Sequence, residues 1–131
     1  MITPYVYYAR VTGVHDGDTL KVNLDLGLDT WRNDLNVRLS GVNCIELKDA
    51  GGVEARDFLR ELLPVGCLVL VESIKYDKFG GRVNAKVYAG GAIGPEVTDV
   101  SSQLIAAGYA VAWNGKGPKP VPAWPLVPKP V

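Results

Sequence analysis

The chain has 131 residues, of which 47% are hydrophobic and 21% are charged, which indicates one globular domain and excludes a disordered or fibrous protein. No apolar run approaches the ~20 residues of a membrane-spanning helix, and no secretory signal precedes the first strand, so we expect no membrane partner. Three of the 14 basic residues lie beyond residue 113, so residues 1–113 carry 11 basic against 14 acidic side chains. This net charge of −3 excludes a general basic field, and phosphate binding has to come from a few well-placed arginines.

The two cysteines, Cys44 and Cys67, are too few for a disulfide framework or a zinc site. We expect them to be buried thiols in a reducing compartment. The compact size and the missing signal fit a cytoplasmic protein, or one encoded by a phage or plasmid, and we expect a monomer.

The first forty residues predict three strands. Residues 5–14 are rich in aromatic and β-branched side chains. Residues 20–26 alternate strictly between apolar and polar side chains, which is typical of a strand with one buried face. After a polar connection over residues 27–34, residues 35–40 alternate again, with Arg38 on the polar face. The three strands therefore form a meander.

The second half of the chain predicts a helix followed by two strands. Apolar residues in 55–62 fall at the i, i+3, i+4, i+7 spacing of one helical face, and Pro64 ends the helix. Residues 67–71 form a nearly continuous apolar run, which suits a strand buried on both faces. Residues 83–87 alternate, with Arg82 on the polar side of that strand.

A loop is expected at residues 90–94, and residues 97–107 predict a second short helix. Thr98 or Asp99 is its expected N-cap, and Gly108 follows its end. Residues 116–131 contain six of the nine prolines, which predicts an extended, polyproline-like tail that offers a docking segment for a partner. The chain thus divides into a domain over residues 1–113 and a proline-rich tail over residues 114–131.

The predicted order is three strands, a helix, two strands and a helix. Five short strands with a helix between the third and the fourth are the pattern of an OB-type barrel. We therefore expect an α+β, mainly β fold: a five-stranded OB-type barrel with that helix and a short C-terminal helix.

The first candidate for chemistry is Asp16-Gly17-Asp18. Two carboxylates beside a glycine can offer hard oxygen ligands to one cation. Asp-Gly is also a strong hairpin signal, and taken alone the hairpin is the better interpretation. His15 is the only histidine, and a role as base is disfavoured because no nucleophile motif surrounds it.

The other candidates are Arg38, Glu46 and Arg82. An arginine can hold a phosphate with a bidentate fork. Each of these side chains taken alone is equally well explained as a solvated surface charge, and the segment 77–82 as a glycine turn flanked by charges.

These segments together resemble the staphylococcal nuclease (thermonuclease-like) family, over about residues 6–113. Each segment is weak alone, and their common order makes the resemblance specific. The carrying motifs are His15-Asp16-Gly17-Asp18-Thr19-Leu20-Lys21-Val22, Val37-Arg38-Leu39 through Glu46, Gly52-Val53-Glu54-Ala55-Arg56, Asp77 through Arg82, and Ser102 through Ala110.

The resemblance implies a calcium site. Asp18 matches the family's first calcium carboxylate, and Asp16 matches an acid that acts through water in the second shell. Asn43 stands where the family usually has a second aspartate ligand. Cys44 stands where a threonine commonly lends its backbone carbonyl.

The resemblance also implies the reaction, which is hydrolysis of phosphodiester bonds in DNA and RNA with little sequence preference. Glu46 matches the glutamate that orients or deprotonates the attacking water. Arg38 and Arg82 match the two phosphate-binding arginines. Lys78 and Phe79 match positions that flank the bound nucleotide.

Three departures from the family pattern carry consequences. Asn43 keeps an oxygen ligand but removes a negative charge, so weaker calcium binding is expected. Phe79 can stack on a base but lacks a hydroxyl. The doubled glycine before Arg82 adds one residue, which a bulge has to absorb if the guanidinium is to reach the phosphate.

Two functions follow as hypotheses. The first is a calcium-dependent endonuclease. The alternative is a catalytically silent OB-fold module that binds nucleic acid or a protein partner, which the acidic body and the Asn43 change favour. Chelator-sensitive cleavage distinguishes them.

Overall fold

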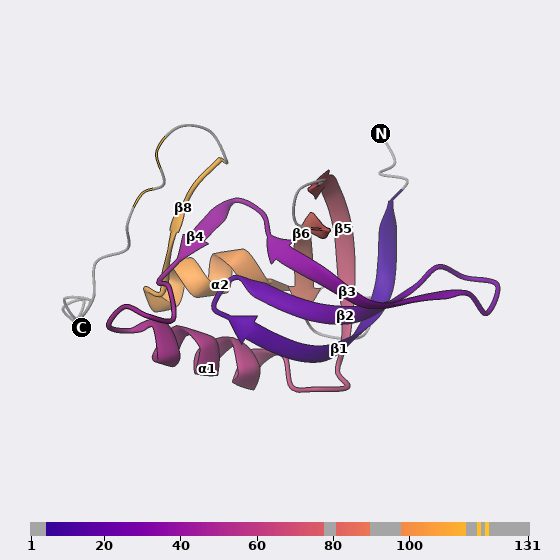
Figure 1. Ribbon diagram of the computed structural model, residues 1–131, viewed down its shortest axis with the longest axis horizontal. Coiled ribbons are helices and arrows are strands. Elements are labelled where there is room, and N and C mark those ends of the chain that lie inside the picture. Colours follow the sequence, from indigo (N-terminus) through magenta and orange to yellow (C-terminus); the bar gives the residue numbers. More distant parts are fainter. Residues whose placement is uncertain (1–4, 78–80, 90–97, 115–117, 119, 121–131) are drawn as a thin grey trace.

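The computed structural model describes residues 5–77, 81–89 and 98–114, together with Pro118 and Pro120 (Figure 1). Its centre is a closed barrel of five strands, which confirms the predicted OB-type fold. The strands pair in the order β3-β2-β1-β5-β6, and a parallel pairing of β3 with β6 closes the ring. Their bounds are β1 Val6–Asp16, β2 Thr19–Asp25, β3 Trp31–Leu39, β5 Leu68–Asp77 and β6 Arg82–Ala89.

The interior of the barrel is filled by the apolar half of each alternating strand. On β2, Leu20 and Val22 are fully buried, while Lys21 between them is exposed. Leu39 and Val71 meet them from β3 and β5. Burying each such side chain contributes about 1.5–3 kcal/mol to the stability of the fold. Because successive side chains point to opposite faces, the polar side chains of each strand lie on the outer face, where they can contact a ligand.

Two helices cover the barrel. The helix α1 (Gly52–Leu62) lies between β3 and β5 in the chain and packs on β1 through Ala55 and Leu59, as its spacing predicts (Figure 1). The helix α2 (Val100–Ala107) contacts β6 and lies beside the C-terminal strand. No helix among the described residues has the length and apolar character needed to cross a membrane.

The caps of α2 are those that its sequence predicts. The Asp99 side chain accepts a hydrogen bond from the Ser101 amide at 3.1 Å, and Gly108 ends the helix with a φ of 87°. The helix begins at Val100 rather than at residue 97, because residues 98–99 form the short strand β7 (Thr98–Asp99) against β6. The predicted loop 90–94 lies outside the described residues.

Two predicted strand limits are wrong. β3 begins at Trp31 and not at residue 35, since its exposed first residues pair with the end of β2, and a polar sequence there hides the ladder. β5 runs on to Asp77, and its residues 68–71 alternate between buried and half-buried. This strand is therefore not equally buried on both faces, because only one face looks into the barrel.

A second, two-stranded sheet was not predicted. The strand β4 (Val42–Cys44) pairs antiparallel with β8 (Ala110–Ala112), and each has only three residues. Strands this short give no periodic signal in a sequence. Their pairing sets the segment after β3, which includes Asn43 and Cys44, beside the C-terminal strand β8.

Candidate functional site

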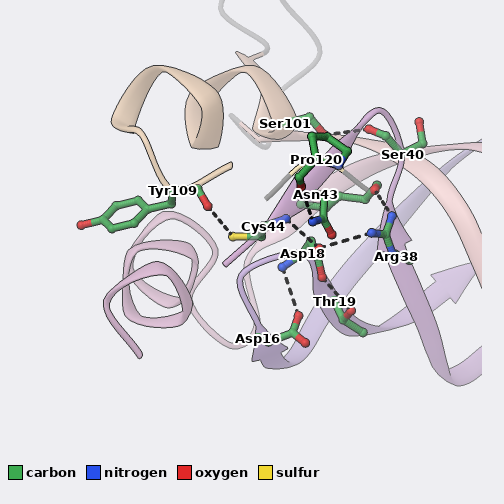
Figure 2. Close-up of polar contacts among 11 residues, drawn as sticks. Asp16, Asp18, Thr19, Arg38, Ser40, Asn43, Cys44, Ser101, Tyr109 and Pro120 are labelled. Atoms are coloured by element: carbon green, nitrogen blue, oxygen red, sulfur yellow. Dashed lines mark hydrogen bonds and ion pairs between the residues drawn. The ribbon is translucent and has the colours of Figure 1, made fainter. Parts of the chain in front are cut away.

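The two aspartates of the first motif lie in the tight turn between β1 and β2 (Figure 2). The Asp18 amide donates to Asp16 Oδ1 at 3.1 Å, which keeps the two carboxylates close together. At Gly17 a Cβ atom would run into the Cys44 sulfur and would lie 3.1 Å from the Ala55 Cβ. The turn is therefore pressed against β4 and α1, and glycine is required there for lack of space.

Asp18 is one of only two buried polar side chains among the described residues. Its Oδ2 accepts from the Cys44 amide at 3.0 Å and from Arg38 Nη2 at 3.4 Å, and the Thr19 hydroxyl donates to Oδ1 at 3.3 Å. Burial, and after it the charge of Asp16, raise the pKa of Asp18 above its ordinary value, against the opposing effect of Arg38. A bound cation stabilises the ionised form of a carboxylate whose charge is disfavoured by burial and by a neighbouring acid.

Arg38 is held on three sides. It pairs with Asp18, with both side chains nearly covered at 13% and 12% exposure, and Nη1 donates to the Leu39 carbonyl at 3.2 Å. The guanidinium carbon lies 5.6 Å from the centre of the Trp113 ring. This cation–π contact fixes the guanidinium without using its hydrogen-bonding edge.

The second arginine joins the same outer face through the strand register. β2, β3 and β6 are neighbours, and equivalent positions on them point to the same side of the barrel. Rungs two residues apart on a strand are separated by about 7 Å. The two adjacent rungs here are Thr19–Arg38–Asn84 and Lys21–Asn36–Arg82.

The doubled glycine does not displace Arg82 from this face. Gly81 takes a φ of 63°, and Arg82 opens β6 opposite Asp77 of β5. The irregularity appears in β5, where the register shifts between Ser73 and Lys75. The extra residue of this bulge is Ile74 of β5, and the ladder keeps its pairing from Lys75 to Asp77 opposite Arg82.

An open groove of about 570 Å³ runs along the second rung and the end of β1. No carboxylate lines it among the residues that the structure describes, although the body of the chain carries a negative net charge. Its polar lining consists of Thr12, His15, Thr19, Lys21, Asn36 and Arg82.

A separate hollow of about 340 Å³ lies at the other end of the β1–β2 hairpin. Tyr5, Tyr7 and Tyr76 line it, with Arg32 stacked 5.7 Å from the Tyr76 ring centre. It shares no lining residue with the groove or with the two rungs, so we do not include it in the candidate site.

Glu46 is not drawn into the Asp18–Arg38 pair. Its side chain is 59% exposed and forms an ion pair with Lys48 at 3.3 Å. Its backbone is nonetheless fixed, because the Glu46 carbonyl accepts from the Asp49 amide at 2.9 Å and lies directly against Gly52 at the start of α1. Glu46 is thus a solvent-facing carboxylate whose backbone is held by the Asp49 amide and by packing against Gly52.

Asn43 faces the end of the chain. Its Nδ2 donates to the Pro120 carbonyl at 2.9 Å, across 77 residues of sequence. Cys44 touches Asp18 through its amide rather than its carbonyl, and its thiol lies 3.0 Å from the Tyr109 carbonyl oxygen. Lys78 and Phe79 lie outside the described residues.

The donor set is of the kind that suits calcium, although it is sparse. Asp16 and Asp18 supply two neighbouring carboxylates, and Asn43 and the Cys44 carbonyl can add neutral oxygens, which are the ligands that Ca²⁺ prefers. Within the described part of the chain, no three His, Cys, Asp or Glu side chains form a metal-binding group. The residues fit a weakly held hard cation rather than a transition metal.

Trp113 and Pro120 were not predicted as residues of this site. Thr19 and Lys21 follow from the alternation of β2 once Asp18 is placed, but Trp113 and Pro120 have no local signal because they reach the site only through the β4–β8 pairing. Comparison of the chain with protein-family models and with curated proteins yields no match.

Proposed function

We propose that the protein is a calcium-dependent phosphodiesterase that hydrolyses DNA or RNA with low sequence specificity. The observation that carries the proposal is the contact between the buried Asp18 and Arg38, with Arg82 on the adjacent rung of the same face. A carboxylate pair, a fixed guanidinium and a second arginine within one face are what a phosphodiester needs as it gathers negative charge.

Each residue takes a role suited to its position. Arg38 and Arg82 bind the phosphate oxygens and stabilise the charge of the transition state. Asp18 holds the cation directly, with Asp16 acting through water and the Asn43 oxygen and Cys44 carbonyl completing its shell. When bound, calcium supplies positive charge beside the phosphate.

Glu46 is the residue that accepts the proton of the attacking water. Its exposure keeps it in contact with solvent, and the fixed backbone of its loop limits where the carboxylate can reach. Lys48 is its resting partner, and an exposed pair of this kind is worth at most about 1 kcal/mol, so the side chain turns toward a substrate at little cost.

The groove supports a nucleic acid as the substrate. Lys21 and Arg82 line the groove, and none of the described carboxylates does. An anionic strand bound at the arginines therefore meets the further positive charge of Lys21 as it runs along the groove. We expect Lys21→Ala to reduce the salt dependence of binding to a single-stranded oligonucleotide by about 0.7 in the slope of log K against log salt. Arg56→Ala, which removes a positive charge from α1 outside the groove, is the matched control with no change.

Cleavage of a fluorescent single-stranded DNA by the full-length chain tests the proposal directly. We expect cleavage in millimolar calcium, none with excess chelator, and a fall of about 10²–10³ in rate for Arg38→Ala. We expect a similar fall in the cleavage rate for Glu46→Ala. Arg56→Ala and Glu61→Ala, both on α1, remove the same charges away from the site. DNA that stays intact at every calcium concentration would contradict the proposal.

One observation favours the silent binding module as a second candidate. Glu46 is paired with Lys48 instead of facing Asp18, as a surface carboxylate without a catalytic role would be. Such a module binds the same oligonucleotide with equal affinity in calcium and in chelator, and returns it uncut.

A further inference from the structure

Two residues that follow β8, Trp113 and Pro120, contact residues of the candidate site. The Trp113 amide donates to the Gly41 carbonyl at 2.8 Å, which prolongs the β4–β8 pairing by one step. The Trp113 ring covers the Arg38 guanidinium. Further along the chain, the Pro120 carbonyl accepts a hydrogen bond from the side-chain amide of Asn43. Both contacts fall on side chains to which the proposed function gives a role.

The contact with Pro120 determines which way the Asn43 amide faces. A planar amide carries its nitrogen and its oxygen about 120° apart, so fixing the nitrogen on one partner directs the oxygen elsewhere. In Figure 2 the Asn43 nitrogen is joined to Pro120, and the oxygen lies on the side of Asp18. Without that partner, the NH₂ group is the half of the amide that a neighbouring carboxylate attracts.

We propose that Pro120 is a positioning residue of the cation site: its carbonyl holds the Asn43 amide so that oxygen, and not nitrogen, faces the cation beside Asp18. This inference rests on the proposed function for the identity of the cation. It also gives a reason for an amide at position 43, because an ionised aspartate has no hydrogen to donate to a carbonyl.

The C-terminal segment has the chemistry for this role. Pro118 and Pro120 line an open hollow with Gly41 and Trp113. A proline-rich segment forms no internal hydrogen bonds, so its carbonyls are available to other groups. The stiff backbone also loses little entropy when it is seated, which makes a single carbonyl a dependable anchor.

The test compares calcium affinity, measured by titration calorimetry, in the full chain and in a chain shortened after Asn114. The shortened chain keeps every helix and strand of the described residues and the whole buried core, so the barrel retains the packing that folds it. We expect shortening to weaken calcium binding by about 10-fold or more, as loss of a ligand-orienting partner does.

Two substitutions of Asn43, each made in both lengths, separate orientation from any general effect. Asn43→Asp presents an oxygen in either rotation, so shortening is expected to leave its calcium affinity unchanged. Asn43→Ala has no amide to orient, so shortening is again expected to have no effect. Only the chain with Asn43 is sensitive to the tail.

The outcomes are distinct. Equal weakening in all three backgrounds, or tighter calcium binding on shortening, overturns the inference; the latter would make the segment a cover over the site. A full-length chain that binds no calcium overturns the proposed cation site and with it the role of Pro120. Calcium binding that follows the expected pattern in a chain that cuts no DNA supports the inference and refutes only the nuclease activity. An unchanged side-chain ¹⁵N resonance of Asn43 on shortening also contradicts it, whatever the activity.

Discussion

Gly52 controls the position of Glu46, and a single methyl group there tests that dependence. A Cβ atom built at Gly52 would lie 2.6 Å from the Glu46 carbonyl carbon and 2.7 Å from the Leu47 Cα, and closer still to the Glu46 oxygen. All three are backbone atoms, which cannot turn aside as the end of a side chain can. Gly52→Ala therefore has to move the loop, the helix or both.

The size of the movement follows from these distances. The contact with the carbonyl carbon alone has to lengthen by about 0.4 Å to reach 3.0 Å and by about 0.8 Å to reach the 3.4 Å of ordinary packing, and the closer contact with the Glu46 oxygen requires a larger shift. Overpacking of this kind costs about 1–3 kcal/mol of folding free energy. Because a shift of about 1 Å in a reacting group can cost on the order of 100-fold in rate, we expect kcat to fall at least about tenfold.

Urea unfolding and single-turnover cleavage of a DNA oligonucleotide measure the two effects. Gly13→Ala is the matched control for stability, since nothing lies within 4 Å of a Cβ at that position. The reasoning fails if the free energy of unfolding of Gly52→Ala lies within about 0.5 kcal/mol of that of the unmodified chain and the variant cuts DNA at the same rate. Gly52 would then not be packed closely against Glu46.

Three further predictions concern the turn and its neighbours. In chelator, the raised pKa of Asp18 means that the folded state holds the Asp18 proton more tightly than the unfolded state does, so the free energy of unfolding falls as the pH rises above 3.8. We expect Asp18→Asn to flatten this part of the stability curve, measured by urea titrations at successive pH values. An unchanged curve would refute the assignment to Asp18. Burial, and then the charge of Asp18, raise the pKa of Cys44 to about 12, so its thiol should resist alkylation at pH 8 until the chain unfolds, as mass spectrometry can show; rapid labelling of the native protein would contradict this. Gly17→Ala should destabilise the fold by about 1–3 kcal/mol, and Cys44→Ala should recover part of that loss by removing the sulfur from the path of the new methyl group; purely additive effects in a double-mutant cycle would show that the two do not collide.

Asp18 shows how stability and the proposed function oppose each other. Burial and the charge of Asp16 disfavour the ionised form of Asp18, so its ionisation lowers the free energy of unfolding as the pH rises above 3.8. The same arrangement gives a cation something to neutralise. Under the proposed function, cation binding offsets the cost of ionising Asp18.

The alternation of apolar and polar side chains on β2 and at the end of β3 was enough to predict strands with one buried face and the outward direction of Lys21 and Arg38. The helix spacing determined that Ala55 and Leu59 would be buried. These are local patterns formed by neighbouring residues, and they decide which face of each element leaves water.

Which side chains from different elements meet on the outer face follows from the tertiary structure alone. The parallel β3–β6 pairing sets Arg82 beside the rung of Arg38, and the β4–β8 pairing brings Trp113 to Arg38 and leads the chain on to Asn43. Contacts of this kind join residues as far as 77 positions apart, and their partners are chosen by the geometry of the closed barrel, which no local period contains.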